Sequence, residues 1–359
     1  DFFCLCVARL LRKMEIVLKK KVCIGIIAVI IPIICLYLLQ CLMVPKYASD
    51  IKEGAMIKEY YSSEKKHDVL ILGDCEVYEN ISTVTMWENY GISSYIRGSA
   101  EQLIWQSYYL LEDTLKYEKP DVVMLNVLAM SEGEAKSEAY NRMTLDGMKW
   151  SKAKVNSIKE SMTDKEDMLS YAFPLLRYHS RWSELSSEDI KYMFKIPKVT
   201  TNGYLMQTGV RPVTTIPKAM PLADYTFSQK NYEYLDKIYS LCKDNGIELV
   251  LIKAPSVYPY WYDEWDEQVR SYADMNNILY LNTVKESDNI GIDYSTDTFD
   301  YGQHLNVDGA EKLSMYIGKR LTDSFSLKDH RNEPAYTQMW NPVVEAYYQE
   351  KTEKMNADK

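Results

Sequence analysis

Histidine is scarce in this sequence: the 359 residues contain only four, namely His67, His179, His304 and His330. Any chemistry that needs an imidazole must therefore use one of these four side chains. Cysteine is scarce as well, because seven residues are too few for a disulfide scaffold at this length, and the odd number leaves at least one thiol unpaired. No cluster of histidine, cysteine and carboxylate residues has the spacing of metal ligands, so we expect neither a metal nor an organic cofactor.

Positive charge is also in short supply, with 42 basic against 51 acidic side chains and a formal net charge of -9. Binding to nucleic acid needs a basic face that neutralises phosphates, so this balance argues against a nucleic-acid partner. Apolar side chains, in contrast, make up 47% of the chain. That is enough to bury one large core or two modest ones, which excludes disordered and fibrous proteins.

Residues 22–44 form the longest apolar run, 23 positions without a charge and with Gln40 as the only strongly polar side chain. A helix of this length spans the hydrocarbon core of a bilayer, roughly 30 Å thick, with some slack for tilt. Pro32 lies within the run, and membrane helices tolerate proline better than soluble helices do. The run therefore predicts a single transmembrane anchor.

Basic residues are concentrated before this run and are sparse after it. The six that precede it are Arg9, Arg12, Lys13, Lys19, Lys20 and Lys21. By the positive-inside rule, residues 1–21 stay in the cytoplasm and the rest of the chain is exported. A cleaved signal peptide is the alternative, but the run is longer than a typical signal and no clear small-x-small cleavage site follows it. The sequence starts at Asp1, and Met14 is an alternative start.

From residue 67 onward, short β-rich runs alternate with amphipathic helices. The five runs that we expect to be strands are 67–73, 92–97, 121–127, 247–252 and 278–281. The first of them is almost continuously apolar, as expected in a parallel sheet that is buried on both faces. A helix over 101–116 and a last helix over 307–321 are among the elements that follow the strands. This alternation predicts an α/β fold with a parallel sheet, helices on both faces and right-handed crossovers.

The alternation breaks between about residues 131 and 228, where several helical pieces and a loop rich in Pro, Thr and Gly form an insert. We expect this insert to cap one end of the sheet of a domain that spans residues 67–325. Residues 45–66 are expected to link the anchor to that domain. Residues 326–359 are polar with scattered aromatic side chains, and we expect them to form a peripheral or loose tail.

Three short segments should lie beyond the carboxyl ends of the strands, where open α/β sheets bind their ligands. The first is Gly73-Asp74-Cys75, directly after the first strand. Gly73 allows a sharp turn and places Cys75 at the start of a helix, where the helix dipole lowers the pKa of a thiol and favours the thiolate nucleophile. The alternative is a buried and inert cysteine, which is the commoner fate of a lone thiol.

The second segment runs from Asp297 to His304, just before the last helix. A carboxylate and an imidazole a few residues apart suit a general base and the group that orients it, whereas a surface loop with a solvated histidine is the alternative. The third segment is Gly98-Ser99, where a strand gives way to a helix. Gly98 can bring a backbone N–H close to a developing oxyanion. Taken alone, an ordinary helix cap by Ser99 is the simpler interpretation.

Together the three segments resemble the SGNH/GDSL hydrolase superfamily. Leu72-Gly73-Asp74-Cys75 is similar to the Gly-Asp-Ser block of that family, Gly98 to its block-two glycine, and His304-Leu-Asn-x-x-Gly to its last block. The resemblance covers about residues 67–321. It implies a flavodoxin-like parallel sheet and acyl-ester chemistry through a covalent acyl-enzyme.

The same resemblance implies roles for individual residues. Cys75 would be the nucleophile, His304 the base and Gly98 part of the oxyanion hole. The family places its aspartate three residues before the histidine, whereas Asp300 stands four residues before His304. We therefore take Asp300 as the orienting carboxylate and keep Asp297 in reserve.

Two further departures from the family pattern concern the nucleophile and the oxyanion hole. Cys75 replaces the serine of the family; thiols also attack acyl groups, so the chemistry survives in principle, although a degenerate enzyme is the alternative. The Gly-x-Asn-Asp of block three is missing, and Asn126 is only a weak substitute as an oxyanion donor. The oxyanion hole would then rest on the backbone N–H groups of Cys75 and Gly98.

With its anchor, the chain is similar to the membrane-bound members of the family that serve cell-surface polymer acylation, such as the D-alanyl-lipoteichoic acid protein and the alginate O-acetyltransferases. This resemblance implies an esterase or O-acyltransferase outside the cytoplasm, on the cell membrane, that acts on a cell-surface polysaccharide or a similar polymer. It also implies a membrane-bound O-acyltransferase as a partner. The alternative is a scaffold that keeps the fold, has lost catalysis, and binds glycan or that partner.

The remaining histidines and the aromatic run 258–262 have two interpretations each. His67 and His330 are expected to be incidental to catalysis. His179 lies among arginines and aromatic side chains that could hold an anionic or sugar substrate, or could simply form a helix surface. The aromatic run would suit carbohydrate stacking as well as core packing. Lys253, which follows the fourth strand, could likewise hold an anionic or sugar substrate or could simply be a surface residue.

Overall fold

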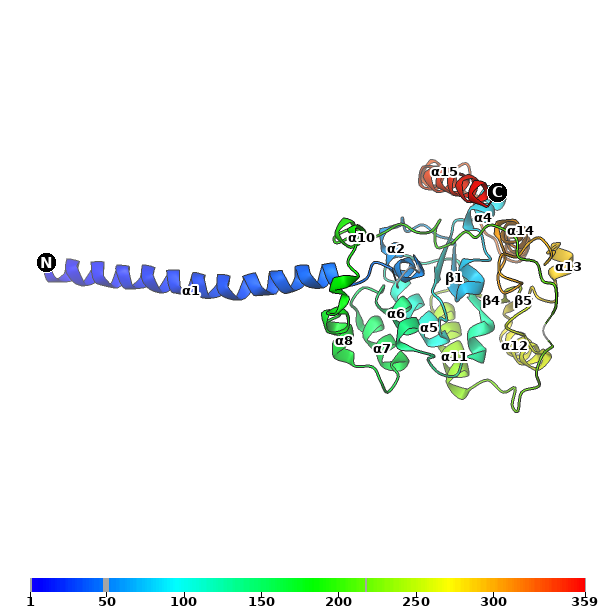
Figure 1. The fold of residues 1–359 in the computed structure, drawn as a ribbon, viewed down its shortest axis with the longest axis horizontal. Helices are drawn as coiled ribbons and strands as arrows, with labels where there is room; N and C mark the ends of the chain where they lie inside the picture. The colour runs from blue at the N-terminus through cyan, green and yellow to red at the C-terminus, as the bar shows by residue number, and fades with distance from the viewer. Residues whose placement is uncertain (1, 48–51, 217, 359) are drawn as a thin grey trace. The chain divides into compact units, whose positions relative to one another are not determined.

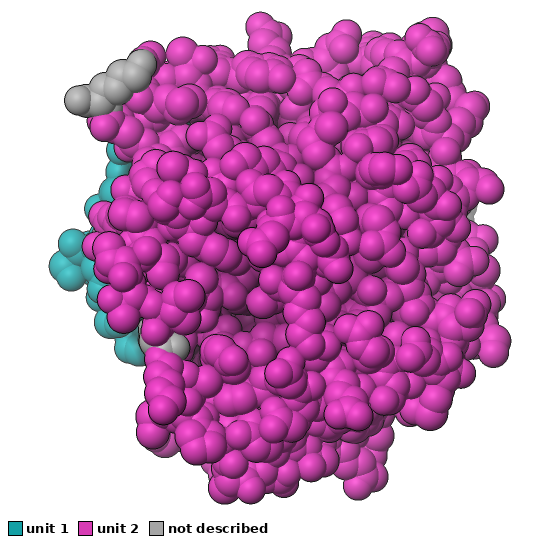
Figure 2. All heavy atoms as spheres, turned by 90° about the vertical axis from the view of Figure 1, so that its right-hand side faces the viewer, with its two compact units in different colours: residues 1–46, 169–195 teal, residues 47–168, 196–359 magenta. Residues whose placement is uncertain are grey.

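The structure is a computed structural model that describes residues 2–47, 52–216 and 218–358. The chain divides into two compact units, which Figure 2 draws in different colours. Unit 1 contains residues 1–46 and 169–195, and unit 2 contains residues 47–168 and 196–359.

The main element of unit 1 is the long helix α1 (Phe2–Met43), drawn in blue in Figure 1. Its part Arg12–Met43 is the one helix, within the described part of the chain, that is long and apolar enough to cross a membrane. Its most apolar 18-residue window has no buried residue, whereas Met43 at its end is buried. The helix includes all but the last residue of the predicted run 22–44. Because α1 lies near the N-terminus, a membrane anchor and a signal sequence both fit this observation.

Residues 169–195, which belong to the predicted insert, form the rest of unit 1 as a series of short helices. These are α8 (Met168–Ala172), α9 (Leu175–Tyr178), η4 (Arg181–Ser183) and α10 (Ser187–Lys191). Helices α9 and α10 contact α1. Nη1 of Arg181 donates a hydrogen bond to the carbonyl of Met43 (2.6 Å) at the end of α1, which satisfies one of the carbonyls that a helix end leaves open.

Unit 2 contains a five-stranded sheet whose strands are all parallel, in the order β2-β1-β3-β4-β5. The strands are β1 (Val69–Gly73), β2 (Ser94–Gly98), β3 (Val122–Asn126), β4 (Glu248–Lys253) and β5 (Leu279–Asn282). Every residue of β1, β2 and β3 is buried, as the apolar run of the first strand predicts. The predicted α/β fold with a flavodoxin-like parallel sheet is therefore confirmed.

Helices pack in two groups around this sheet. Helix α4 (Thr83–Tyr90) contacts α14 (Val307–Ser324), while α5 (Ile104–Thr114) contacts both α7 (Lys152–Ser161) and α11 (Gln229–Asp244). Figure 1 shows α4 and α14 on one side of the strands and α5, α7 and α11 on the other. The remaining helices of unit 2 that are longer than four residues are η3 (Val127–Ser131), α6 (Glu138–Leu145), α12 (Asp263–Asn276) and α15 (Pro334–Ala357).

The expected polar tail is instead a helix that packs onto unit 2. In α15, Trp340, Val343 and Tyr347 are buried and recur at spacings of three and four, the pattern of one helix face. The ring of Trp340 stacks on Trp87 of α4 with centroids 5.1 Å apart, and its Nε1 donates to Oγ of Ser93 (3.1 Å). Of the two expectations for residues 326–359, a peripheral or a loose tail, the loose one is wrong for α15. Its three buried side chains pack on the rest of unit 2, although the segment is polar in overall composition.

The expected linker is also structured. Residues 52–62 form η1 (Lys52–Ala55), α2 (Met56–Glu59) and η2 (Tyr60–Ser62), in which Met56, Ile57 and Tyr60 are buried. The ring of Tyr60 packs edge-on against Tyr95 of β2, with centroids 5.1 Å apart. These residues are therefore part of the folded body of unit 2. Residues 48–51 of the expected linker lie outside the described residues.

Candidate functional site

The turn after β1 is Gly73-Asp74-Cys75, and it requires glycine at its first position. Gly73 has a φ of +155°, and a Cβ there would lie 2.7 Å from Cβ of Asn126. Asp74 accepts a hydrogen bond from the backbone N–H of Glu76 (3.1 Å) and so caps helix α3 (Cys75–Tyr78). Cys75 is thus the first residue of a short helix at the carboxyl end of β1, and it is half-buried.

Asp300 and His304 meet on the loop that precedes α14. Nδ1 of His304 lies 2.6 Å from Oδ2 of Asp300, and Oδ1 of Asp300 accepts from the backbone N–H of His304 (2.8 Å). Since Nδ1 faces the carboxylate, Nε2 is the nitrogen that can serve a reacting group. The reserve residue, Asp297, is engaged elsewhere: its Oδ2 accepts from Nζ of Lys312 (2.6 Å) and from the N–H of Asp293 (2.8 Å).

The loop of His304 is tied to the segment that follows Cys75. Asn80 accepts a hydrogen bond from the N–H of Leu305 (2.8 Å). Glu79 connects the two segments, because its N–H donates to the carbonyl of Cys75 (3.0 Å) and its Oε2 lies 3.2 Å from Nδ1 of His304. Within the described residues, no hydrogen bond joins Cys75 to His304 itself. Glu79 therefore links Cys75 and His304, which are not bonded to each other directly.

Gly98 lies at the end of β2, in register with Gly73. A Cβ on Gly98 would lie 3.0 Å from the carbonyl oxygen of Gly73 and 3.1 Å from Cδ1 of Tyr78. Glycine therefore lets β2 approach the turn after β1 closely. Ser99 does not cap the following helix, whose N-cap residue is Leu103. The role of Gly98 in an oxyanion hole stays a prediction.

A buried ion pair that we did not predict lies beside the Cys75 turn. Nζ of Lys253 is 2.7 Å and 2.8 Å from the two carboxylate oxygens of Glu76, and both side chains are at most 1% exposed. The hydroxyl of Ser256 lies 2.9 Å from Oε1 of Glu76 and 3.1 Å from Nζ of Lys253. The signal in the sequence is a lysine directly after the four apolar residues 249–252 of β4, with a glutamate directly after Cys75.

Asn126 belongs to the same network, at the end of β3. Its Nδ2 donates to Oδ1 of Asp74 (2.9 Å) and to Oε2 of Glu76 (3.1 Å), while its Oδ1 accepts from the N–H of Ala254 (3.4 Å). Both amide hydrogens are thereby in use. Asn126 holds the acidic residues around Cys75 in place, so it is not a spare oxyanion donor.

The electrostatic setting of Cys75 is opposite to the one expected from a helix N-terminus. Burial raises the pKa of the Cys75 thiol well above its usual value, and the carboxylates of Asp74, Glu79, Glu76 and Glu101 raise it further. Helix α3 has only four residues, so its dipole is small compared with these charges. The expectation of a preformed thiolate is therefore wrong. A thiol in this setting needs a base to become a nucleophile.

The groups around His304 are shifted toward their protonated forms. Burial opposes protonation of His304, but the hydrogen bond to Asp300 and the charges of Glu79 and Glu76 outweigh it and raise the pKa of His304 to about 9. Burial raises the pKa of Glu79 to about 7. Burial and the neighbouring Glu76 likewise raise the pKa of Asp74 to about 7. At neutral pH the site therefore holds a protonated imidazole.

Two of the other histidines pair with carboxylates outside this loop. Nδ1 of His67, just before β1, lies 2.9 Å from Glu118. Nε2 of His330 lies 3.1 Å from Asp68, so both imidazoles pair with carboxylates in unit 2. His179 is exposed in unit 1.

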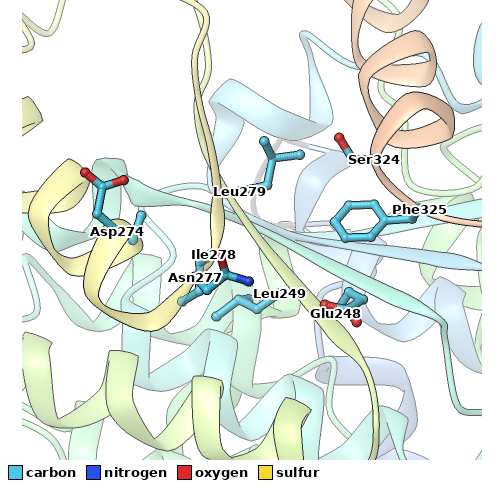
Figure 3. A pocket seen from close by; sticks show the side chains of 9 residues that line it. Glu248, Leu249, Asp274, Asn277, Ile278, Leu279, Ser324 and Phe325 are labelled. Carbon is cyan, nitrogen blue, oxygen red and sulfur yellow. The ribbon is translucent and has the colours of Figure 1, made fainter.

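Two cavities lie at the amino ends of the strands, the edge of the sheet opposite Cys75. The larger, of about 520 Å³, is lined by Glu248 and Leu279, which begin β4 and β5, and by Phe325 after α14 (Figure 3). The second, of about 290 Å³, is lined by Glu59 and His67, which precede β1. Neither cavity is lined by Cys75, His304, Asp300 or Gly98. In residues 2–47, 52–216 and 218–358, no group of three or more His, Cys, Asp and Glu side chains could hold a metal ion.

No protein-family model matches the sequence, and no curated protein matches it either. Among solved structures, the chain is similar to a protein of Bacteroides fragilis NCTC 9343 described as a "putative acylhydrolase", with 11% identity, a TM-score of 0.37, and coverage of 74% of this chain and 94% of the other. It is also similar to a GDSL-like lipase of Bacteroides thetaiotaomicron VPI-5482, with 11% identity, a TM-score of 0.37, and coverage of 76% and 100%. Similarity this low assigns no activity, so the function must be inferred from the residues of the site.

Proposed function

We propose that this chain is a membrane-anchored SGNH/GDSL-type enzyme that cleaves or transfers acyl esters outside the cytoplasm, through an acyl group held on Cys75. The observation that carries the proposal is the bond between His304 and Asp300 (2.6 Å) on a loop tied to the Cys75 turn through Glu79. A base, its orienting carboxylate and a nucleophile at the carboxyl edge of a parallel sheet are the parts that acyl transfer needs.

The reaction would proceed in two halves. Neutral His304 takes the thiol proton at Nε2, and the thiolate of Cys75 attacks the acyl carbon. Backbone N–H groups of Cys75 and Gly98 would stabilise the oxyanion of the tetrahedral intermediate. The ester oxygen then leaves with the proton from His304, and a thioester remains on Cys75. In the second half, His304 takes a proton from water or from an acceptor hydroxyl, which attacks the thioester and restores the thiol.

The acceptor and the partner are proposed from the resemblance to anchored polymer-acylating proteins. The acceptor would be a cell-surface polysaccharide or a similar polymer, and a membrane-bound O-acyltransferase would deliver the acyl group. Helix α1 supports this location, since it is long and apolar enough to hold the protein in a membrane.

A second candidate function is a scaffold without catalysis, and the raised pKa of the Cys75 thiol favours it. A thiol that burial and carboxylates keep protonated at neutral pH is a poor nucleophile unless a base is available. The fold would then serve to bind glycan or the membrane partner.

Acylation of Cys75 separates these two functions. We expect the purified full chain, incubated with p-nitrophenyl acetate at alkaline pH, to gain one acetyl group that peptide mapping by mass spectrometry locates on Cys75. The matched control is Cys242→Ala, which removes a buried thiol on the apolar face of α11 and should leave the adduct unchanged. Equal acetylation of the chain in Cys75→Ala and wild type would rule out Cys75 as the nucleophile.

Ester turnover should also rise with pH toward alkaline values. Protonated His304 cannot accept the thiol proton, and its pKa of about 9 places the active form above neutral pH. Glu79→Gln removes one of the charges that raise this pKa, so the rise in kcat/KM should move to lower pH.

The matched control for this shift is Glu233→Gln, at a glutamate of α11 that does not act on the pKa of His304. Its pH profile should coincide with that of the wild type. Identical profiles for Glu79→Gln and wild type would mean that His304 is not the titrating base.

A further inference from the structure

A row of apolar side chains is exposed on the short helices of unit 1. Six large side chains of residues 169–195 are between 55% and 70% exposed: Leu169, Phe173, Leu176, Trp182, Ile190 and Phe194. Leu169, Leu176, Trp182 and Ile190 lie on the successive short helices α8, α9, η4 and α10, while Phe173 and Phe194 lie close after α8 and α10 in the sequence. Single exposed apolar residues are common on soluble proteins, but six within 27 residues form a surface that favours an apolar environment.

The position of this surface along α1 indicates which apolar environment it meets. The lysines at positions 19–21 mark the inner boundary of the membrane, and about 20 helical residues span the hydrocarbon core. Counting from Val22, the outer boundary falls near Cys41 to Val44. Met43 is 0% exposed, whereas Leu36 is 57% exposed. Helices α9 and α10 contact α1, and Arg181 bonds to Met43, so residues 169–195 lie against α1 at the depth where it leaves the hydrocarbon.

Contacts within unit 1 hold the segment at that depth. Besides the bond from Arg181 to the carbonyl of Met43, Nη2 of Arg181 lies 3.3 Å from Oδ1 of Asp189 at the N-terminal end of α10. Arg181 thereby joins the end of α1 to α10, and η4 carries both Arg181 and the exposed Trp182. Tryptophan is enriched at the boundary between hydrocarbon and headgroups, which is where this contact places it.

The charge of the segment is nearly balanced, so its contact with lipids would depend on apolar area and not on electrostatic attraction. Residues 169–195 contain four basic and three acidic side chains, and this near balance gives little attraction to anionic headgroups. A helix surface of this kind binds membranes mainly through the apolar area that it buries among headgroups and upper acyl chains.

We propose that residues 169–195 form an interfacial collar around α1, which lies in the outer leaflet of the membrane with the six apolar side chains among the lipids. The collar goes beyond the proposed catalytic function. It requires that α1 is kept as an anchor, and it would hold the chain at a fixed depth where α1 emerges.

Depth-dependent quenching of Trp182 fluorescence tests the collar. The full chain is reconstituted in phosphatidylcholine vesicles whose acyl chains carry bromine either near the glycerol end or near the methyl end, and intact mass confirms that α1 is retained. The difference in emission between wild type and Trp182→Phe isolates Trp182. We expect loss of most of this difference with bromine near the glycerol end and a smaller loss with bromine near the methyl end.

Two matched comparisons make the result specific. Trp150 in unit 2 is 54% exposed, close to the 61% of Trp182, and the difference from Trp150→Phe should be quenched less. Phe173→Asp combined with Phe194→Asp should reduce the quenching of Trp182. Ile216→Asp combined with Met220→Asp, which are as exposed but lie in unit 2, should not reduce it.

Three results would overturn the proposal: no quenching of Trp182, equal quenching of Trp182 and Trp150, or removal of α1 from the mature chain. If Trp182 is unquenched and the segment crosslinks to another membrane protein or to a second copy, that protein is the occupant of the surface and the lipid assignment is wrong.

Discussion

Turnover of an acetyl ester should fall by about 10²- to 10⁴-fold when His304 is replaced by alanine, the range that a general base typically contributes. The loss is expected to be large because burial and four carboxylates hold the pKa of the Cys75 thiol well above its usual value. An ordinary cysteine is deprotonated to a few per cent at neutral pH, whereas the deprotonated fraction of Cys75 is far smaller. The measurement is kcat/KM of the full chain in detergent at about pH 9, where His304 of the wild type is half deprotonated.

The control for this substitution is His179→Ala, which removes an exposed imidazole of unit 1 and should leave kcat/KM unchanged. Asp300→Asn is the companion variant, since it keeps the size of the orienting group but removes its charge. It should lower kcat and also move the pH profile to lower values, because the bond to Asp300 raises the pKa of His304. Unchanged kcat/KM in His304→Ala would remove His304 from the mechanism and favour the scaffold function.

The fold could be predicted from the sequence because its strands carry a strong local signal. The strands β1, β3 and β4 are apolar almost throughout, and each observed strand lies within two residues of its predicted bounds. Right-handed crossovers are compatible with several strand orders, and it is the family resemblance that implies the flavodoxin-like one. Helix α15 was missed because Pro342 interrupts it and because three buried side chains, Trp340, Val343 and Tyr347, stand among polar residues.

The pairing of Asp300 with His304 could be predicted from the sequence, whereas the charge state of the groups around Cys75 could not. Asp300 and His304 are close in sequence, so their bond follows from local geometry. The pKa of Cys75 is raised mainly by burial, which cannot be inferred from the neighbouring sequence. The acidic residues at positions 74, 76 and 79, which raise it further, can be seen in the sequence. The partner of Glu76 is Lys253, 177 positions away, and only the parallel pairing of the strands brings the two together.

Replacing Lys253 by methionine should destabilise the fold by about 3–5 kcal/mol, because it leaves the carboxylate of Glu76 buried without its counter-charge. Removing both charges should lower the free energy of unfolding much less than removing one. Replacing a whole buried ion pair by uncharged groups often leaves the stability almost unchanged. We therefore expect Glu76→Gln combined with Lys253→Met to recover most of the loss. The measurement is the free energy of unfolding of the full chain in detergent, from denaturant titration followed by near-ultraviolet circular dichroism.

The matched control is Lys319→Met, which breaks an exposed pair with Asp323 at the same distance of 2.7 Å and should leave the unfolding midpoint unchanged. The comparison separates burial from bond length as the source of the effect. Additive losses from Glu76→Gln and Lys253→Met in the double variant would mean that the two side chains act independently. A large coupling would show that this network is a structural support of the Cys75 turn, because Glu76 directly follows Cys75 and Asn126 binds both Asp74 and Glu76.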